Sequence, residues 1–207
     1  MSSTPPVQQS IVVLDLEGVL VPEIWIAVAE RTGVEALRRT TRDEPDYDLL
    51  MRGRLALLAE HGLTMSMIAE VIATLVPLDG AKSFLDELRN RTQVVILSDT
   101  FEQFGAPLMR QLGMPTLLCH RLVVTDDRIV DYHLRMPDQK RHAVDAFRGL
   151  NYQVVAAGDS YNDSAMLSAA NAGFWFHAPD SIRAQFPQFP ATDSYDDLLA
   201  LISQALT

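Results

Sequence analysis

Three short apolar runs in this chain each end on acidic or hydroxyl side chains, and this repeated pattern constrains the fold most strongly. The runs are IVVLDLEG from residue 11, QVVILSDT from residue 93 and YQVVAAGDSYND from residue 152. They are rich in β-branched residues and do not alternate with polar ones, which is typical of strands buried on both faces. Open α/β sheets bind ligands beyond the carboxyl ends of their strands. The pattern therefore predicts a parallel sheet with Asp15, Ser98 and Asp159 at one edge.

Helical patterns separate these runs, as the crossovers of a parallel sheet require. We expect an α/β fold, a doubly wound, mostly parallel, Rossmann-like sheet. From Pro22 to about Pro77 apolar residues recur at helical spacing and no strand pattern occurs, so this stretch predicts a helical insert after the first strand. The stretch EIWIAVAERTGVEALRR predicts one helix, TLLCH predicts a short strand, and RLVVTDDRIVDYHLR predicts a β-hairpin. The expected domains are an α/β core of residues 1–20 and 79–207 and a small helical cap of residues 21–78.

The composition excludes several classes of protein. The chain has 207 residues, 48% of them hydrophobic, and a formal net charge of −10. An acidic chain repels nucleic acid and anionic membranes, so neither is an expected partner. The single Cys119 cannot form an internal disulfide, the N-terminus lacks the features of a signal peptide, and no apolar run is long enough to span a bilayer. We expect a soluble cytoplasmic protein whose residues 1–9 are disordered.

Carboxylates gathered at one sheet edge need a compensating positive charge. A hard divalent cation supplies it, and Mg²⁺ prefers a few carboxylates together with water and substrate phosphate. Aspartate is also a covalent carrier of phosphoryl groups, and Lys140 in PDQKR offers a cation for the charge of a phosphate. The combination predicts phosphoryl transfer with Mg²⁺ as cofactor.

The four motifs DLEGV, SDT, the lysine of QKR and GDSYND occur in this order and resemble those of the haloacid dehalogenase superfamily of phosphatases. The resemblance covers most of the chain, including an insert at the first cap position. Within that superfamily, longer stretches are similar to phosphoserine phosphatases that also transfer the phosphoryl group to homoserine: LDLEGVLVPEIWIA, TTRDEPDYD, VVILSDTF, PLMRQLG and AAGDSYND. The resemblance implies that L-phosphoserine and homoserine are substrates, in serine and threonine biosynthesis. It also suggests a homodimer.

The resemblance implies a role for each motif residue. Asp15 would be the nucleophile that receives the phosphoryl group, and Glu17 the general acid and base. Ser98 would donate a hydrogen bond to the phosphoryl group, while Lys140 would neutralise it and hold Asp15. The resemblance also implies metal ligands at Asp15, Glu17 (through its main-chain carbonyl), Asp159 and Asp163.

Substrate-binding residues also follow from the resemblance. Glu23 and Arg54 match cap positions that hold the amino and carboxyl groups of phosphoserine in similar phosphatases. Asn162 would contact phosphate or substrate. Asp163, besides its place near the metal, would support the site.

The sequence departs from the common superfamily pattern at two positions. Glu17 stands where aspartate is usual, and its extra methylene moves the carboxyl group by about an ångström or more. Asp99, expected among the substrate-binding residues, stands where many phosphoserine phosphatases have glycine. We hypothesise that both residues alter the competition between water and an acceptor alcohol for the phosphorylated aspartate. The hypothesis fails if Asp at 17 and Gly at 99 leave the ratio of transfer to hydrolysis unchanged.

Structural roles compete with some of these assignments. Asp15 could cap a turn, and Ser98 and Thr100 could cap the following helix. Asp163 could be an acid favoured at a helix N-terminus, and Lys140 could be a solvated charge. Arg52 and Arg54 are two residues apart, so only one of them faces the site easily. The segment TTRDEPDYD, with Arg42 and Asp43, is either a capping box between Thr41 and Glu44 or a loop near the cleft between cap and core.

Two rival functions also remain at this stage. One is a related phosphatase that acts on another small phosphoester, which would have no use for Glu23 and Arg54. The other is a non-catalytic protein that binds a phosphorylated metabolite or a protein partner. The presence of both Asp15 and Lys140 argues against the second.

Overall fold

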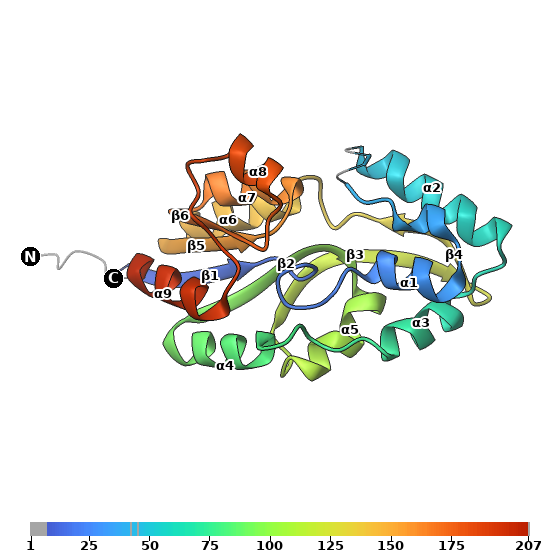
Figure 1. Ribbon diagram of the computed structural model, residues 1–207, viewed down its shortest axis with the longest axis horizontal. Helices are drawn as coiled ribbons and strands as arrows, with labels where there is room; N and C mark the ends of the chain where they lie inside the picture. Colours follow the sequence, from blue (N-terminus) through green and yellow to red (C-terminus); the bar gives the residue numbers. More distant parts are fainter. Residues whose placement is uncertain (1–7, 42, 45, 207) are drawn as a thin grey trace, which may run out of the picture.

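The computed structural model describes residues 8–206 except 42 and 45, and it contains a seven-stranded sheet between helical layers (Figure 1). The order across the sheet is β4-β3-β2-β1-β5-β6-β7. Neighbouring strands pair parallel except β3 and β4, which form an antiparallel hairpin. The strands are β1 Gln9–Leu14, β2 Gln93–Phe101, β3 Thr116–Thr125, β4 Arg128–His133, β5 Tyr152–Gly158, β6 Ala172–Phe176 and β7 Ala191–Thr192. The expected mostly parallel α/β sheet is confirmed.

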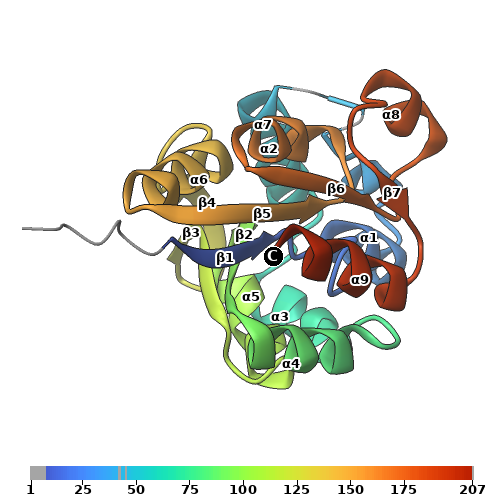
Figure 2. The same cartoon turned by 90° about the vertical axis from the view of Figure 1, so that its left-hand side faces the viewer.

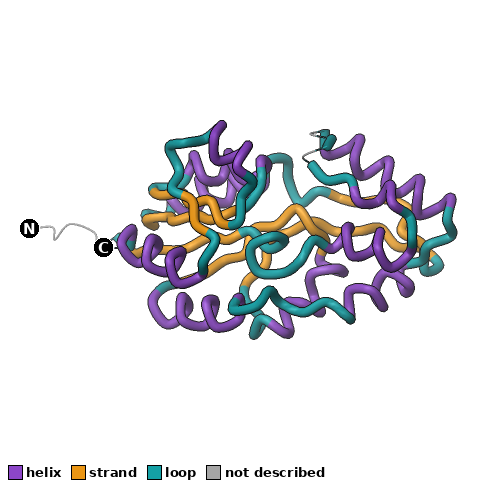
Figure 3. Tube along the Cα trace, viewed as in Figure 1, coloured by secondary structure: helices purple, strands orange, loops and turns teal. Residues whose placement is uncertain are grey.

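Helices cover both faces of this sheet. Figures 1 and 2 show α6, α7 and α8 on one face, with α4, α5 and α9 on the other. The helices are α1 Ile24–Thr32, α2 Tyr47–Glu60, α3 Met65–Ala73, α4 Ala81–Arg91, α5 Glu102–Gln111, α6 Gln139–Gly149, α7 Ser164–Ala169, α8 Asp180–Gln185 and α9 Tyr195–Ala205, with short 3₁₀ turns η1 Glu35–Arg38 and η2 Tyr161–Asp163. The tube view in Figure 3 distinguishes the strands, in orange, from these helices, in purple.

The first strand is buried on both faces, as its continuous apolar run predicts. Val12 and Leu14 belong to the apolar cluster on the side of α4 and α9, whereas Ile11 and Val13 belong to the cluster on the side of α6 and α7. Both sets of side chains are 5% exposed or less. A strand so enclosed can present polar groups only at its ends, which is where Asp15 follows it.

The strand order creates a crevice beside β1. The chain passes from β1 to β2 and β3 on one side, and then returns to place β5 on the other side. This reversal is the place where α/β sheets bind ligands. Asp15 after β1 and Asp159 after β5 therefore lie on the two flanks of the crevice.

Two sequence expectations for the elements are wrong in detail. The helix expected over EIWIAVAERTGVEALRR is interrupted, because Gly33 adopts φ 71° and closes α1 in a left-handed cap before η1 begins. The short strand expected at TLLCH continues without a break through Thr125 as β3. The hairpin itself is confirmed, and Asp126 and Asp127 at its turn both have positive φ.

The helices that follow β1 pack against the β3–β4 hairpin. Arg52 of α2 forms a 2.7 Å ion pair with Asp131 of β4. At the start of α3, the main-chain N–H and Oγ of Ser66 donate hydrogen bonds of 2.9 and 2.8 Å to Asp127 in the hairpin turn. Figure 1 shows α1, α2 and α3 gathered at this end of the sheet. The insert thus rests on strands contributed by a later part of the chain, and its domain limits at residues 21–78 stay a prediction.

Within the described residues, no single helix is long and apolar enough to cross a membrane. Helices α2 and α3 meet a length and composition criterion only as a pair, which is bent by 106° at the break between them. The expected disorder concerns residues 1–9. Residues 1–7 lie outside the described part of the chain, and Gln9 begins β1.

Candidate active site

The centre of the site is a buried lysine between two carboxylates. Lys140, in the first turn of α6, places Nζ 2.9 Å from Asp15 Oδ1 and 2.7 Å from Asp163 Oδ1. Burial lowers the pKa of Lys140, but Asp15, Asp163 and Asp99 raise it by more, so the ammonium stays charged. Lys140 is 3% exposed, which excludes its interpretation as a solvated surface charge.

Three buried carboxylates next to this lysine fit a divalent metal ion. Oxygen atoms of Asp15, Asp159 and Asp163 all lie within 4.8 Å of one another. Burial, together with Asp163 and Asp159, raises the pKa of Asp15, and Lys140 acts in the opposite direction. Three carboxylates against one ammonium leave a buried excess of negative charge. An oxygen-rich, negatively charged set of this kind suits Mg²⁺.

Gly18 leaves the space that this cluster needs. It has φ 76°, and a Cβ atom at this position would lie 2.4 Å from Asp159 Oδ2. The residue after Glu17 must therefore combine a left-handed backbone with the absence of a side chain. This explains the glycine of the DLEGV motif in physical terms.

The loop after β5 is organised by Asp163. Its Oδ2 atom accepts hydrogen bonds from the main-chain N–H groups of Asp159, at 3.0 Å, and Ser160, at 3.1 Å. The Ser160 side chain and Asp163 form a capping box at the start of η2. Asp163 is fully buried. It caps the start of a helix and supports the site through the same contacts, so the two expected roles describe one arrangement. The carboxylate orients this loop with one oxygen and holds Lys140 with the other.

Glu17 faces the insert and lies outside the carboxylate cluster. Its Oε2 atom accepts a 2.8 Å hydrogen bond from the main-chain N–H of Ile24, at the start of α1. Burial and the nearby Glu23 raise the pKa of Glu17 to about 7. A carboxyl group with this pKa can donate and accept a proton near neutral pH. The expected metal contact of Glu17 concerned its main-chain carbonyl, and it stays a prediction.

Arg54 is the arginine of the RGR segment that faces inward. Its guanidinium lies 4.6 Å from the Trp25 ring centre and donates a 2.8 Å hydrogen bond to the Arg39 main-chain carbonyl. Among the described residues, its Nε atom is one of two buried side-chain polar atoms without a hydrogen-bond partner. Burial lowers the pKa of Arg54 to about 10, with Glu17 the strongest opposing charge. Arg52 instead pairs with Asp131 on the surface.

Glu23 lies where the insert begins. It is the half-buried residue that precedes α1, and its side chain does not cap that helix. Its charge raises the pKa of Glu17 and counteracts the lowering of the Arg54 pKa, which places all three residues in one electrostatic environment. The structure therefore brings the two expected cap residues, Glu23 and Arg54, close to Glu17.

Ser98 and Asp99 lie near the end of β2, which continues to Phe101. Ser98 is buried, and its Oγ accepts a 3.2 Å hydrogen bond from the Thr100 main-chain N–H. The next helix begins at Glu102 without a side-chain cap, so Ser98 and Thr100 are not its N-cap residues. Asp99 accepts a 2.9 Å hydrogen bond from Asn162, which brings two expected substrate-binding residues together.

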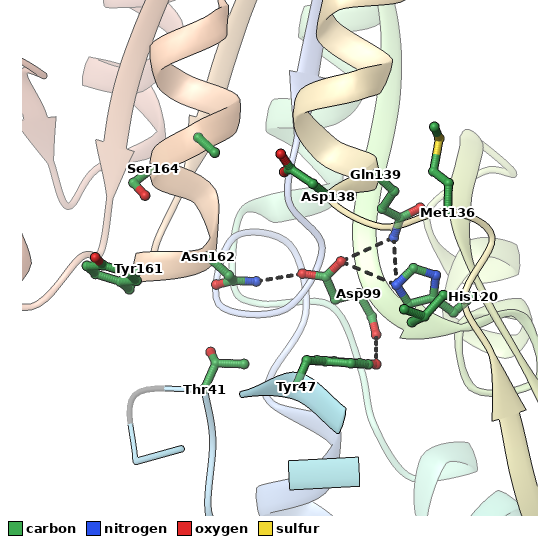
Figure 4. A pocket seen from close by; sticks show the side chains of 12 residues that line it. Thr41, Tyr47, Asp99, His120, Met136, Asp138, Gln139, Tyr161, Asn162 and Ser164 are labelled. Atoms are coloured by element: carbon green, nitrogen blue, oxygen red, sulfur yellow. Dashed lines mark hydrogen bonds and ion pairs between the residues drawn. The ribbon is translucent and has the colours of Figure 1, made fainter. Parts of the chain in front are cut away.

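Three residues around Asp99 were not predicted from the sequence. The Gln139 side chain donates a 3.2 Å hydrogen bond to Asp99 Oδ1, and His120 Nε2 lies 3.5 Å from the same oxygen. Tyr47 of α2 donates a 2.7 Å hydrogen bond to the Asp99 main-chain carbonyl. Figure 4 shows these groups converging on Asp99 from three separate elements. The sequence signals were that Gln139 precedes Lys140 and that Tyr47 lies in the segment TTRDEPDYD.

A cavity of about 340 Å³ opens beside Asp99, between the insert and the core. Its walls include Thr41 and Tyr47 from the insert, and Tyr161 and Asn162 from the core (Figure 4). The interpretation of TTRDEPDYD as a loop near this cleft is confirmed for Thr41. Arg42 lies outside the described residues.

The expected capping box between Thr41 and Glu44 is wrong, because other residues form the caps in this loop. The main-chain N–H of Thr40, and not of Thr41, donates a 2.9 Å hydrogen bond to Asp43. Helix α2 then begins after Asp46, whose side chain accepts hydrogen bonds from the main-chain N–H groups of Asp48 and Leu49. Thr41 is therefore left to line the cavity.

Comparisons with known proteins identify a family and several similar sequences. A family model for haloacid dehalogenase-like hydrolases matches residues 10–171. The phosphoserine phosphatase ThrH of Pseudomonas aeruginosa is 64% identical over 186 residues, which cover 89% of this chain and 91% of that protein. The phosphoserine phosphatase of Pseudomonas syringae pv. tomato is 63% identical over 186 residues, which cover 89% of this chain and 78% of that protein.

Solved structures share the fold at lower sequence identity. A substrate-bound phosphoserine phosphatase complex matches with a TM-score of 0.77 at 20% identity, covering 98% of this chain and 100% of that chain. A phospho-aspartyl intermediate analogue of phosphoserine phosphatase matches with a TM-score of 0.72 at 21% identity, covering 86% and 91%. At this identity the likeness supports the α/β fold.

Proposed function

The chain belongs to the haloacid dehalogenase-like hydrolases, and we propose that it is a phosphatase that takes the phosphoryl group of L-phosphoserine onto Asp15 and passes it to water or to homoserine. The observation that carries this proposal is Lys140, which is held 2.9 Å from Asp15 inside a buried acidic cluster. A charged lysine at this position supports a carboxylate nucleophile and a phosphoryl group arriving beside it.

The choice of substrate rests on the insert and on the relatives. Two relatives at 63% and 64% identity are phosphoserine phosphatases. The buried Arg54 has an unpartnered Nε atom, which suits the carboxylate of an amino acid. Glu23 supplies a negative charge nearby for the ammonium group of the same amino acid. A substrate without a carboxylate would leave the buried Nε atom of Arg54 without a hydrogen-bond partner.

In the first step, the Asp15 carboxylate attacks phosphorus and the bond between phosphorus and the serine oxygen breaks. Glu17 gives its proton to that oxygen, so serine leaves as a neutral alcohol. Lys140 and Ser98 hold the phosphoryl oxygens, and the ammonium of Lys140 offsets their charge. Bound Mg²⁺, held by Asp15, Asp159 and the carbonyl of Glu17 with Asp163 beside it, would neutralise the phosphate and the carboxylates.

In the second step, Glu17 takes a proton from the acceptor hydroxyl, which then attacks phosphorus. The bond between phosphorus and Asp15 breaks, and the original carboxylate returns. Water as acceptor releases inorganic phosphate, and homoserine gives O-phosphohomoserine. Helices α1–α3, in the expected cap, would cover the site and exclude bulk water, which lets an alcohol compete.

A product-partition assay tests the proposal. The protein is incubated with L-phosphoserine and Mg²⁺, with and without homoserine, and the products are resolved by ³¹P NMR, with Asp15→Asn as the inactive control. O-phosphohomoserine that requires Asp15 supports the transferase activity. Inorganic phosphate alone restricts the protein to hydrolysis. The absence of both products would favour the alternative, a phosphatase acting on another small phosphoester.

A further inference from the structure

The carboxylate of Asp99 lies close to Lys140 without binding it. Asp99 Oδ2 is 3.8 Å from Lys140 Nζ, which is within ion-pair range and beyond hydrogen-bond distance. The Lys140 ammonium has three hydrogens, and Asp15 and Asp163 each accept one at 2.9 and 2.7 Å. The third hydrogen is left for a phosphoryl oxygen. A shift of Asp99 by about 1 Å would let its carboxylate take this hydrogen instead.

Asn162 Nδ2 donates a 2.9 Å hydrogen bond to Asp99 Oδ2 itself. Two further side chains oppose the shift by holding the other oxygen of Asp99. Gln139 Nε2 donates to Asp99 Oδ1 at 3.2 Å, and its Oε1 accepts a 3.1 Å hydrogen bond from Arg135 Nε. Gln139 directly precedes Lys140 in α6. The first turn of this helix therefore positions both the side chain that restrains Asp99 and the lysine itself. Gln139 is 2% exposed, and its amide therefore has little freedom to turn away.

His120 forms the second restraint, and its tautomer follows from its contacts. The main-chain N–H of Arg135 donates a 3.1 Å hydrogen bond to His120 Nδ1, so Nδ1 is the acceptor. The ring hydrogen is therefore on Nε2, which faces Asp99 Oδ1 at 3.5 Å. His120 is 4% exposed and its ring contacts the edge of Tyr47, so the imidazole is fixed from several sides. Figure 4 shows His120 and Gln139 directed at the same carboxylate.

We propose that His120 and Gln139 are positioning residues that hold the Asp99 carboxylate away from Lys140 and so keep the third ammonium hydrogen available to the phosphoryl group. This inference rests on the proposed phosphoryl transfer and assigns the two residues a role in it. Asp99 is a half-buried anion with a side chain 27% exposed, and without the restraints on Oδ1 only the Asn162 hydrogen bond would oppose its movement toward the nearest cation. That movement would also place a negative charge where the phosphate must bind.

The experiment compares the effect of His120→Leu in two backgrounds. In the wild-type background we expect kcat/KM for L-phosphoserine and for p-nitrophenyl phosphate to fall by about tenfold, because the contact between the His120 Nε2–H and a charged carboxylate is lost. In the Asp99→Asn background the same change should cost less than about twofold, because no charged carboxylate remains to be restrained. A purely structural role of His120 would give equal losses in the two backgrounds, and equal losses would overturn the proposal.

Further variants separate positioning from general damage. His120→Gln keeps a donor near the Nε2 position and should recover most of the activity. Gln139→Leu should repeat the pattern if His120→Leu does not fold. His133→Leu changes an exposed histidine of β4 and should leave the rates unchanged. Loss of activity in His133→Leu equal to that in His120→Leu would contradict the proposal.

Binding of inorganic phosphate gives a readout independent of turnover. In calorimetric titrations with Mg²⁺ present, His120→Leu should weaken phosphate binding by about tenfold, and Asp99→Asn in the same chain should restore it. If the protein hydrolyses p-nitrophenyl phosphate and not L-phosphoserine, the proposed substrate fails while this test of the restraint still applies. Unchanged phosphate affinity in His120→Leu would overturn the restraint itself.

Discussion

The carboxylate of Glu17 accepts a hydrogen bond from the main-chain N–H of Ile24, with 2.8 Å between Oε2 and N. Glu17 follows Asp15, the proposed nucleophile, by two residues, whereas Ile24 begins the first helix of the insert. The longer side chain of glutamate therefore connects the candidate acid and base directly to the start of the insert. This contact gives the departure from aspartate at position 17 a specific structural consequence.

Replacement of Glu17 by glutamine should separate the two chemical steps. With L-phosphoserine, Glu17→Gln should lower kcat by about 10²- to 10⁴-fold, because the serine oxygen needs a proton to leave. With p-nitrophenyl phosphate, whose leaving group needs no proton, the first step should persist and give a burst of p-nitrophenolate. Stopped-flow absorbance measures a burst equal to the enzyme concentration, followed by slow turnover. Equal loss in the burst and the steady rate would show that Glu17 is not the acid of the first step.

The inward and outward arginines of α2 should differ sharply when replaced. Arg54→Met should raise KM for L-phosphoserine by about tenfold or more, because a buried ionic contact to the substrate carboxylate is lost. Its effect on p-nitrophenyl phosphate, which has no carboxylate, should be small. Arg52→Met is the matched control, since Arg52 is more than half exposed and contacts Asp131 and Asp48. Steady-state kinetics with both substrates would refute the assignment if Arg54→Met impaired both equally.

Alanine at position 18 should damage the metal site beyond its cost to the backbone. Gly18 and Gly33 have similar φ values of 76° and 71°, but only a Cβ at Gly18 meets the Asp159 carboxylate. Gly33→Ala should therefore show backbone strain alone, of about 1 kcal/mol in the free energy of unfolding. Gly18→Ala should also weaken Mg²⁺ binding, as measured by calorimetry. Equal Mg²⁺ affinity in the two variants would mean that Gly18 is needed only for its backbone conformation.

Removal of one charge from the acidic cluster should have opposite effects with and without metal. Without Mg²⁺, Asp159→Asn should raise the melting temperature, because two neighbouring carboxylates are relieved of repulsion. With Mg²⁺, the wild-type protein should gain about 2.7 kcal/mol at a metal concentration 100-fold above Kd, and the variant much less. Thermal unfolding with and without chelator measures both effects. Asp196→Asn, at an exposed carboxylate of α9, should respond to Mg²⁺ like the wild-type protein.

The sheet and the acidic edge could be predicted because they depend on local sequence. Each apolar run fixes a buried strand, and the residue that ends it must lie at the carboxyl edge of a parallel sheet. Asp15, Ser98 and Asp159 follow from that rule alone. The choice of Lys140 over Arg141 does not follow from spacing, and it required the family resemblance together with the first turn of α6.

The surroundings of Asp99 could not be predicted in the same way. His120 reaches Asp99 only because β3 runs beside β2, where the pairing shifts register between Leu97 and Phe101. Tyr47 arrives from the insert, 52 positions earlier in the chain. Such contacts depend on how the elements pack against one another, and the local hydrophobic periodicity of the sequence carries no information about that packing. The break at Gly33 was missed for a different reason, since one glycine in a strong helical pattern can be tolerated or can end the helix.

The most direct test of the account is to identify the residue that carries the phosphoryl group. The wild-type protein is mixed with L-phosphoserine and Mg²⁺, quenched in acid within the first turnover, digested and analysed by mass spectrometry. We predict one added phosphoryl group on the peptide that contains Asp15, with fragment ions placing it on that side chain, and none in Asp15→Asn. Turnover with no phosphorylated peptide, or with the group on another residue, would contradict the account.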